Sequence, residues 1–132
     1  DVGNPSNWVR IMDLFGNDLA ALKQTVSSFT FTDADTREAI RTLYDRYSYI
    51  ACPHTAIAWL AAETYRRQHK GNFATVFLST AHPCKFPEVF PPEIAAQITV
   101  PAQVNVLQRR AKEAIGLDMD YERFKNYLLG AR

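Results

Sequence analysis

Apolar residues recur at helical spacing along the first third of the chain. A first stripe follows the pattern i, i+3, i+4, i+7 and predicts a helix that begins at Asn4-Pro5 and ends at Gly16. Two further helices are predicted on the same grounds, one after Asn17 and one opened by a capping box of Asp35 and Glu38. The inward-facing positions of the three helices are Trp8, Ile11, Met12 and Phe15; Leu19, Leu22 and Val26; and Ile40, Leu43, Tyr44 and Tyr47.

Short apolar stretches in the middle of the chain predict strands. Phe29–Thr32 alternates between apolar and polar residues, and Tyr49–Cys52 is a short apolar run. Phe73–Leu78 is apolar almost throughout, which is typical of a strand buried on both faces of a parallel sheet. An alanine-rich helix, His54–His69, is predicted between the last two strands. The pattern therefore predicts an α/β fold, with a few mostly parallel strands flanked by helices.

The character of the sequence changes near residue 92. Prolines interrupt the chain between residues 87 and 101, and two helices are then predicted, Val104–Ile115 and Met119–Leu129, with Asp118 as the cap of the second. We expect residues 1–92 to belong to the α/β domain and residues 93–132 to form a helical tail of that domain.

Composition is that of an ordinary globular chain. Of 132 residues, 47% are hydrophobic and 22% charged, and the formal net charge is +1. Lysine and arginine are scattered, so neither nucleic acid nor an anionic membrane is expected as a partner. No apolar run approaches the roughly 20 residues that span a bilayer. With two cysteines and no signal peptide, we expect a cytoplasmic protein.

Two or three strands are few for an α/β domain, because sheets commonly contain about 5–6 strands. The chain also begins without methionine. We therefore expect a fragment, whose missing strands lie in an amino-terminal part that precedes Asp1 or in another chain. Exposed apolar surface at the missing strands would favour self-association.

Three polar segments carry the candidate chemistry: residues 1–7, 52–56 and 79–86. The third follows the predicted strand Phe73–Leu78, and ligands bind at the carboxyl ends of strands in open α/β sheets. A structural explanation is also open, since Ser79 and Thr80 could satisfy backbone groups where the strand ends. His54 could likewise only cap or pack the first turn of its helix.

A zinc site is the competing interpretation of the same segments. Cys52, His54, His82 and Cys84 form the Cys2His2 set of many structural zinc sites. Their spacing, Cys-x-His and His-x-Cys, is tighter than usual, and prolines stiffen both pairs, so no metal is predicted. A small independent binding module with such a site remains the alternative function. A nucleophilic pair of Cys84 with either histidine has no supporting motif.

The three polar segments together resemble successive motifs of one enzyme family. Asp1-Val2-Gly3-Asn4-Pro5-Ser6-Asn7, Pro53-His54-Thr55-Ala56 and Thr80-Ala81-His82-Pro83-Cys84-Lys85-Phe86-Pro87 look like motifs of threonine synthase, in the same order and with similar separations. The chain departs from the family pattern at Cys52, where an acidic residue is usual, and at Cys84, where alanine is usual.

The resemblance implies a fold, a cofactor and a reaction. Threonine synthases have the tryptophan synthase β-like fold (fold type II). They use pyridoxal 5′-phosphate to convert O-phospho-L-homoserine and water into L-threonine and phosphate. The Schiff-base lysine is expected upstream of Asp1, so no catalytic residue is assigned here and the isolated chain is expected to be inactive. By the same resemblance, Thr80 and Ser79 contact the cofactor. The residues implied for phosphate or substrate are Asn4, Ser6, His54, His82 and Lys85.

Overall fold

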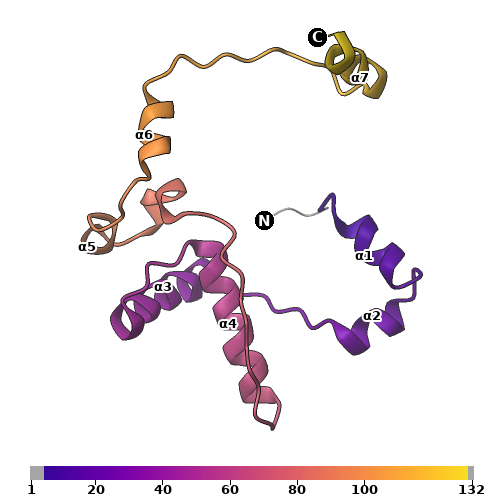
Figure 1. Cartoon of the computed structure of the whole chain (residues 1–132). Coiled ribbons are helices and arrows are strands. Elements are labelled where there is room, and N and C mark those ends of the chain that lie inside the picture. Colours follow the sequence, from indigo (N-terminus) through magenta and orange to yellow (C-terminus); the bar gives the residue numbers. More distant parts are fainter. Residues whose placement is uncertain (1–4, 131–132) are drawn as a thin grey trace. The chain divides into compact units, whose positions relative to one another are not determined.

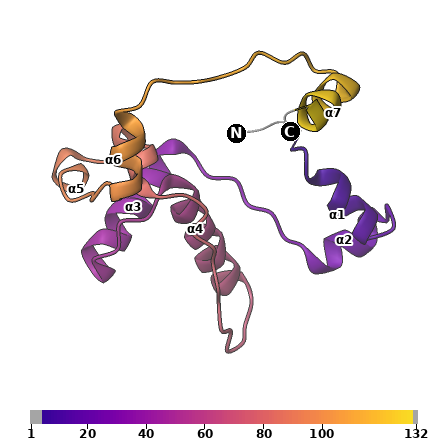
Figure 2. The same ribbon diagram turned by 45° about the horizontal axis from the view of Figure 1, so that its top comes forward.

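Helices make up all the regular structure of the part of the chain that is described, residues 5–130 (Figures 1 and 2). The structure is a computed structural model. It divides into two compact units, residues 1–98 and 99–132, which are described separately. The helices of the first unit are α1 (Trp8–Leu14), α2 (Leu19–Thr25), α3 (Asp33–Tyr47), α4 (Pro53–Gln68), the short 3-10 turns η1 (Pro83–Lys85) and η2 (Pro87–Val89), and α5 (Pro92–Ala95). Those of the second are α6 (Ala102–Gln108) and α7 (Tyr121–Gly130).

Helix α3 begins with a capping box, three residues earlier than predicted. Thr32 and Asp35 form it: the Asp35 backbone N–H donates to the Thr32 hydroxyl, and the Thr32 N–H donates to the Asp35 carboxylate at 2.8 Å. Hydrogen bonds from the Thr32 side chain, and then from its backbone, lower the pKa of Asp35. The helix ends at Ser48, whose φ of 51° places it in the left-handed region and turns the chain toward α4.

Helix α4 confirms the predicted alanine-rich helix to within one residue at each end. Pro53 occupies its first position, where a missing backbone N–H has no cost, and Cys52 lies at the N-cap. The helix packs against α3. It was predicted to lie on a sheet, and that packing is wrong.

The hydrophobic core lies where α3 and α4 meet the segment that contains α5. Ile40 of α3 and Ile94 of α5 are both 0% exposed, and Phe90 lies beside them. The remaining buried members of this cluster are Ala39, Leu43, Ala51 and Ala56. Small residues on α3 and α4 let the helix axes approach, and the two isoleucines fill the space that remains. The proline-rich segment after residue 87 is therefore part of the core.

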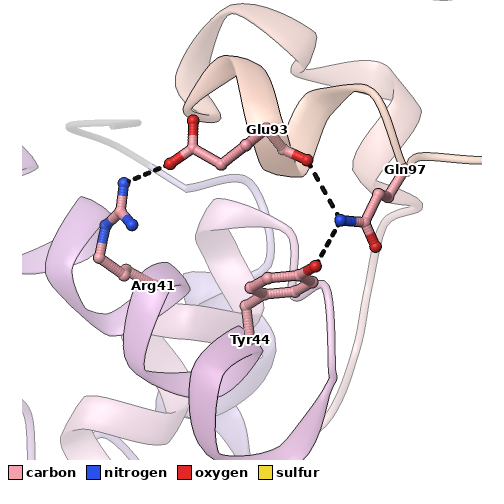
Figure 3. A network of polar contacts seen from close by, with 4 residues as sticks. All are labelled: Arg41, Tyr44, Glu93 and Gln97. Atoms are coloured by element: carbon pink, nitrogen blue, oxygen red, sulfur yellow. Dashed lines mark hydrogen bonds and ion pairs between the residues drawn. The ribbon is translucent and has the colours of Figure 1, made fainter.

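Polar contacts cross from α3 to the α5 segment above this core (Figure 3). Arg41 pairs with Glu93 at 2.7 Å, and Gln97 donates to the hydroxyl of Tyr44 and, at 3.3 Å, to the Glu93 carbonyl. The pKa of Glu93 is lowered by the hydrogen bond from its own backbone N–H and then by the one from Arg41. Because both side chains of the ion pair are about half exposed, solvent screens the pair and it contributes little to stability. These contacts orient the segment, and the core holds it.

The predicted strand Phe73–Leu78 is not a strand. It returns along α4 as an extended segment, in both views, and it forms no backbone hydrogen bond within residues 5–130 (Figures 1 and 2). Val76 is 85% exposed. A strand requires a neighbouring backbone to pair its N–H and C=O groups, and here the neighbour is a helix whose own groups are already paired. The α/β prediction is therefore wrong for the chain as described.

The other two predicted strands fail for the same reason. Phe29–Thr32 and Tyr49–Cys52 are extended connections ahead of α3 and α4, without a partner strand among the described residues. The alternation in the first survives as a contact between Phe29 and Phe31, whose stacked rings lie 6.4 Å apart. An apolar pattern of period 2 indicates an extended backbone, but a sheet forms only where a second strand is present to pair with it.

Most helix ends in the remaining parts differ from prediction by a few residues, whereas α6 ends seven residues before the predicted Ile115. Asn7 lies at the N-cap of α1, Asp18 rather than Asn17 caps α2, and Tyr47 is exposed on α3. Asn4, the predicted cap of α1, lies outside the described residues. In the second unit, α6 stops at Gln108, and the Arg123 N–H at the start of α7 is bound by Asp120, while Asp118 pairs with the Arg123 side chain. The predicted division near residue 92 stays a prediction.

Residues 5–130 contain no helix that is both long and apolar enough to cross a membrane.

We predict that Ile94→Ala destabilises the first unit by about 2–5 kcal/mol, because it removes buried methyl groups and leaves a cavity between α3, α4 and α5. Urea unfolding followed by circular dichroism measures the change. Leu14→Ala is the matched control, since Leu14 is 80% exposed on α1. Equal unfolding midpoints for the two variants would show that α5 does not belong to the core.

Candidate functional site

Two of the three polar segments meet at the start of α4. Thr55 lies in its first turn and is 0% exposed, and its hydroxyl donates to the Ser79 hydroxyl at 3.2 Å. The Thr55 oxygen also lies 3.2 Å from the sulfur of Cys52. Residues 52–55 and the extended segment are thus joined by side chains that are 24 positions apart in sequence. This contact brings Ser79 to the helix start.

Phe86 forms a second link between the same segments. The His54 ring lies against the Phe86 ring, with 5.2 Å between ring centroids and 57° between their planes. The Lys85 ammonium lies over the same Phe86 ring, at 5.7 Å from its centroid. Phe86 itself packs against the hydrophobic core. A histidine and a cation are therefore held next to the first turn of α4 by one anchored aromatic ring.

His82 caps the short η1 turn. The Cys84 backbone N–H donates to its Nδ1 at 3.2 Å. A ring nitrogen that accepts a hydrogen bond carries no proton, so Nε2 is the ring atom that can donate.

Thr80 follows Ser79 and is exposed, and no hydrogen bond of its hydroxyl is found within residues 5–130. Ser6 lies in the turn ahead of α1, and no hydrogen bond in the same range joins it to Ser79, Thr80 or α4. Asn4 lies outside the described residues. The structure therefore groups Ser79, His54 and Lys85 around the α4 start, with Thr80 and His82 on the same short segment.

The proposed zinc ligands do not form one cluster. Cys52 is buried and contacts Thr55, His54 lies on Phe86, and His82 is engaged with the backbone of Cys84. No group of three or more potential ligands among His, Cys, Asp and Glu occurs within the described range. Both cysteines are free thiols.

A separate hollow of about 490 Å³ lies between α3, α4 and the extended segment. Its walls are largely aromatic and apolar, and none of the predicted site residues lines it. The lining residues are Leu43, Tyr47, Tyr49, Trp59, Ala62, Glu63, Arg66, Thr75 and Phe77.

Sequence reasoning did not single out Thr55 or Phe86 as site residues. Both lie inside the motifs quoted above, but the sequence did not predict their contacts with other side chains. The signal for Thr55 was a hydroxyl in the first turn of a helix that begins with Cys-Pro. Its bond to Ser79 depends on how the chain folds back along α4, which local pattern does not encode.

Comparison with known proteins identifies the family. The model of the carboxyl-terminal part of threonine synthases matches residues 55–128, more than half of the chain. The chain belongs to this family. The matched range contains Thr55, Ser79, Thr80, His82 and Lys85, which are the residues that the structure gathers at the start of α4 or on the segment beside it.

Individual relatives carry the same name. The threonine synthase of Haemophilus influenzae is 30% identical over 98% of the chain, and that of Serratia marcescens 28% identical over 98%. The Escherichia coli threonine synthase is 34% identical over 67% of the chain. The chain spans 29%, 29% and 19% of the lengths of these relatives. No solved structure matches the chain.

The two thiols are predicted to differ in reactivity. Cys84 is partly exposed and should react with a thiol-specific reagent in the native chain, whereas Cys52 is buried against Thr55 and should react only when the fold opens. Labelling kinetics followed by mass spectrometry, with and without urea, measures both rates. Cys84→Ser is the control that isolates Cys52. Rapid native labelling of Cys52 in that variant would contradict the burial of the α4 start.

Proposed function

We propose that this chain supplies the carboxyl-terminal portion of a threonine synthase. In the complete enzyme it would bind pyridoxal 5′-phosphate and take part in converting O-phospho-L-homoserine and water into L-threonine and phosphate. The observation that carries the proposal is the family match over residues 55–128, together with the grouping of motif residues at the start of α4.

The hydroxyl groups at Ser79 and Thr80 fit the ring nitrogen of this cofactor. When bound, pyridoxal phosphate supplies an electron sink for carbanionic character in the substrate. A neutral hydroxyl can donate a hydrogen bond to an unprotonated pyridine nitrogen, whereas a carboxylate would favour the protonated ring. Thr80 is exposed and its hydroxyl has no hydrogen bond within residues 5–130, so it is the proposed donor, with Ser79 beside it.

The groups near the α4 start fit a phosphate. The backbone N–H groups at a helix amino terminus and its dipole favour an anion, and α4 is 16 residues long. Lys85 adds a positive charge, held over Phe86, and His54 and His82 add ring nitrogens. These residues are proposed to hold the phosphate of the cofactor or of the substrate. Asn4 and Ser6 remain proposed at the same role by family resemblance alone.

The remaining parts of the proposal concern the chain by itself. The Schiff-base lysine is proposed to lie in the rest of the enzyme, so the 132-residue chain alone would be inactive. Exposed Val76 and Leu78 support the proposal that the isolated chain self-associates. A cytoplasmic location is proposed from the biosynthetic role.

A chimera tests the proposal. The matching segment of the Haemophilus influenzae threonine synthase is replaced by this chain, which aligns over 98% of its length. We expect the chimera to release phosphate from O-phospho-L-homoserine and the isolated chain to release none. A folded chimera without activity, or an active isolated chain, would contradict the proposal.

In the chimera, Thr80→Val is predicted to lower turnover roughly ten- to a hundredfold. The variant keeps the shape and removes the donor, and loss of a hydrogen bond that strands its partner costs about 1–3 kcal/mol. Thr80→Ser should be nearly harmless, and Thr80→Asp should change the cofactor absorption spectrum by favouring the protonated ring. Steady-state kinetics and absorption spectra measure these effects.

Thr75→Val is the matched control, because Thr75 is an exposed threonine on the same extended segment. Turnover and cofactor spectrum of Thr80→Val equal to those of Thr75→Val would assign the Thr80 hydroxyl a structural role only.

A further inference from the structure

We infer that Thr55 is a positioning residue, which holds the Ser79 hydroxyl as an outward hydrogen-bond donor toward the cofactor. The inference rests on the proposed function and extends it to a residue that does not itself contact the ligand. It starts from a chain of three side chains, Cys52, Thr55 and Ser79, which are joined by two contacts of 3.2 Å.

Once Thr55 donates to Ser79, the number of protons on its hydroxyl sets the direction of the rest of this chain. A threonine hydroxyl has one proton and two acceptor sites. Thr55 donates its proton to Ser79, so in its contact with Cys52 it must accept, and the Cys52 thiol is the donor. The Ser79 oxygen is then an acceptor toward Thr55, and its own proton is left to donate elsewhere. Because the ring nitrogen is assigned to Thr80, the Ser79 proton is left for a second acceptor atom of the cofactor.

The surroundings of Ser79 make this bond important for its position. Residues 70–81 form no backbone hydrogen bond within the described range, so side chains hold the segment. At its start, the Phe73 ring packs edge-on against Tyr65 of α4, with 5.9 Å between centroids. Near its end, the bond from Thr55 ties Ser79 to the first turn of the helix. The tie therefore restricts where Ser79 and Thr80 can lie.

Thr55 is well suited to this task because it is buried in a packed helix. It is 0% exposed, in the first turn of a 16-residue helix that begins at a proline and packs on α3. A buried hydroxyl on a rigid helix gives a fixed point, whereas Ser79 lies on an extended segment. Removing the buried Thr55 hydroxyl or the exposed Ser79 hydroxyl breaks the same hydrogen bond.

The first test uses the 132-residue chain without cofactor. Backbone order parameters from NMR relaxation are measured for residues 79–82 in the parent chain, Thr55→Val, Thr55→Ser and Thr36→Val. Thr36→Val is the matched control, since it removes another buried threonine hydroxyl, which donates to the Thr32 carbonyl at 2.9 Å inside α3. We expect a fall from about 0.85 toward 0.6 or below for Thr55→Val only. Unchanged values in Thr55→Val, or an equal fall in Thr36→Val, would overturn the inference.

The second test is a double-mutant cycle in the chimera, with the dissociation constant of pyridoxal 5′-phosphate as the readout. Thr55→Val should raise this constant roughly three- to tenfold, as expected for loss of one neutral hydrogen bond, and Thr55→Ser should restore it. Once Ser79 is replaced by alanine, Thr55→Val should have no further effect. An equal effect of Thr55→Val with and without the Ser79 hydroxyl would overturn the inference.

The two proposals fail in different ways. A parent chimera that binds no cofactor in a saturable manner would contradict the proposed function, and the order parameters of the chain would still decide whether Thr55 fixes Ser79. A parent that binds, combined with order parameters at residues 79–82 that ignore Thr55→Val, would contradict the positioning role alone. Ser79→Ala guards against misfolding, because Ser79 is exposed and its replacement leaves the core intact.

Discussion

The burial of Ile94 in the core that contains Ile40 is the interaction that holds α3, α4 and α5 together. It joins a short helix in a proline-rich segment to the pair formed by α3 and α4, and both side chains are fully buried. Burying an aliphatic side chain of this size stabilises a fold by about 1.5–3 kcal/mol, more than the exposed ion pair above it can add. Because Phe86 is the last residue of the polar segment and packs on the same core, the core also fixes where residues 79–86 reach α4. The geometry of the candidate site therefore follows from packing.

Polar side chains then act on a framework that is already in place. Thr55 is rigid because α4 is packed, and Lys85 and His54 are grouped because Phe86 is anchored. The extended segment itself has no backbone partner in the described range, so its position depends on a few side-chain contacts. The first unit thus combines a packed core with a polar segment that few contacts hold. The chain belongs to the threonine synthase family and spans 29% of the length of the Haemophilus influenzae relative.

Much of the helical structure could be predicted from the sequence, whereas the predicted sheet is absent from residues 5–130. The start of α4 was predicted because proline and an alanine-rich apolar pattern are local signals. The strand prediction for Phe73–Leu78 was wrong, because a fully apolar run forms a buried strand only if partner strands exist. Here the segment lies along a helix. The hydrogen bonds between Arg41 and Glu93 and between Tyr44 and Gln97 join residues 52 and 53 positions apart. No local sequence pattern predicts such pairs. The candidate site residues were assigned by motif resemblance and stay a prediction, whereas the Thr55–Ser79 bond could be identified only from the fold.

Amide hydrogen exchange of the 132-residue chain tests most directly the claim that a helical core carries an unpaired extended segment. Exchange requires that a backbone hydrogen bond open, so the amides inside α3 and α4 should be protected. Those of residues 73–78 should exchange at close to the rate of an unstructured peptide, since no backbone group pairs with them in the described range. Protection of residues 73–78 equal to that of α4 would contradict the account, because it would require a strand partner that residues 5–130 do not contain.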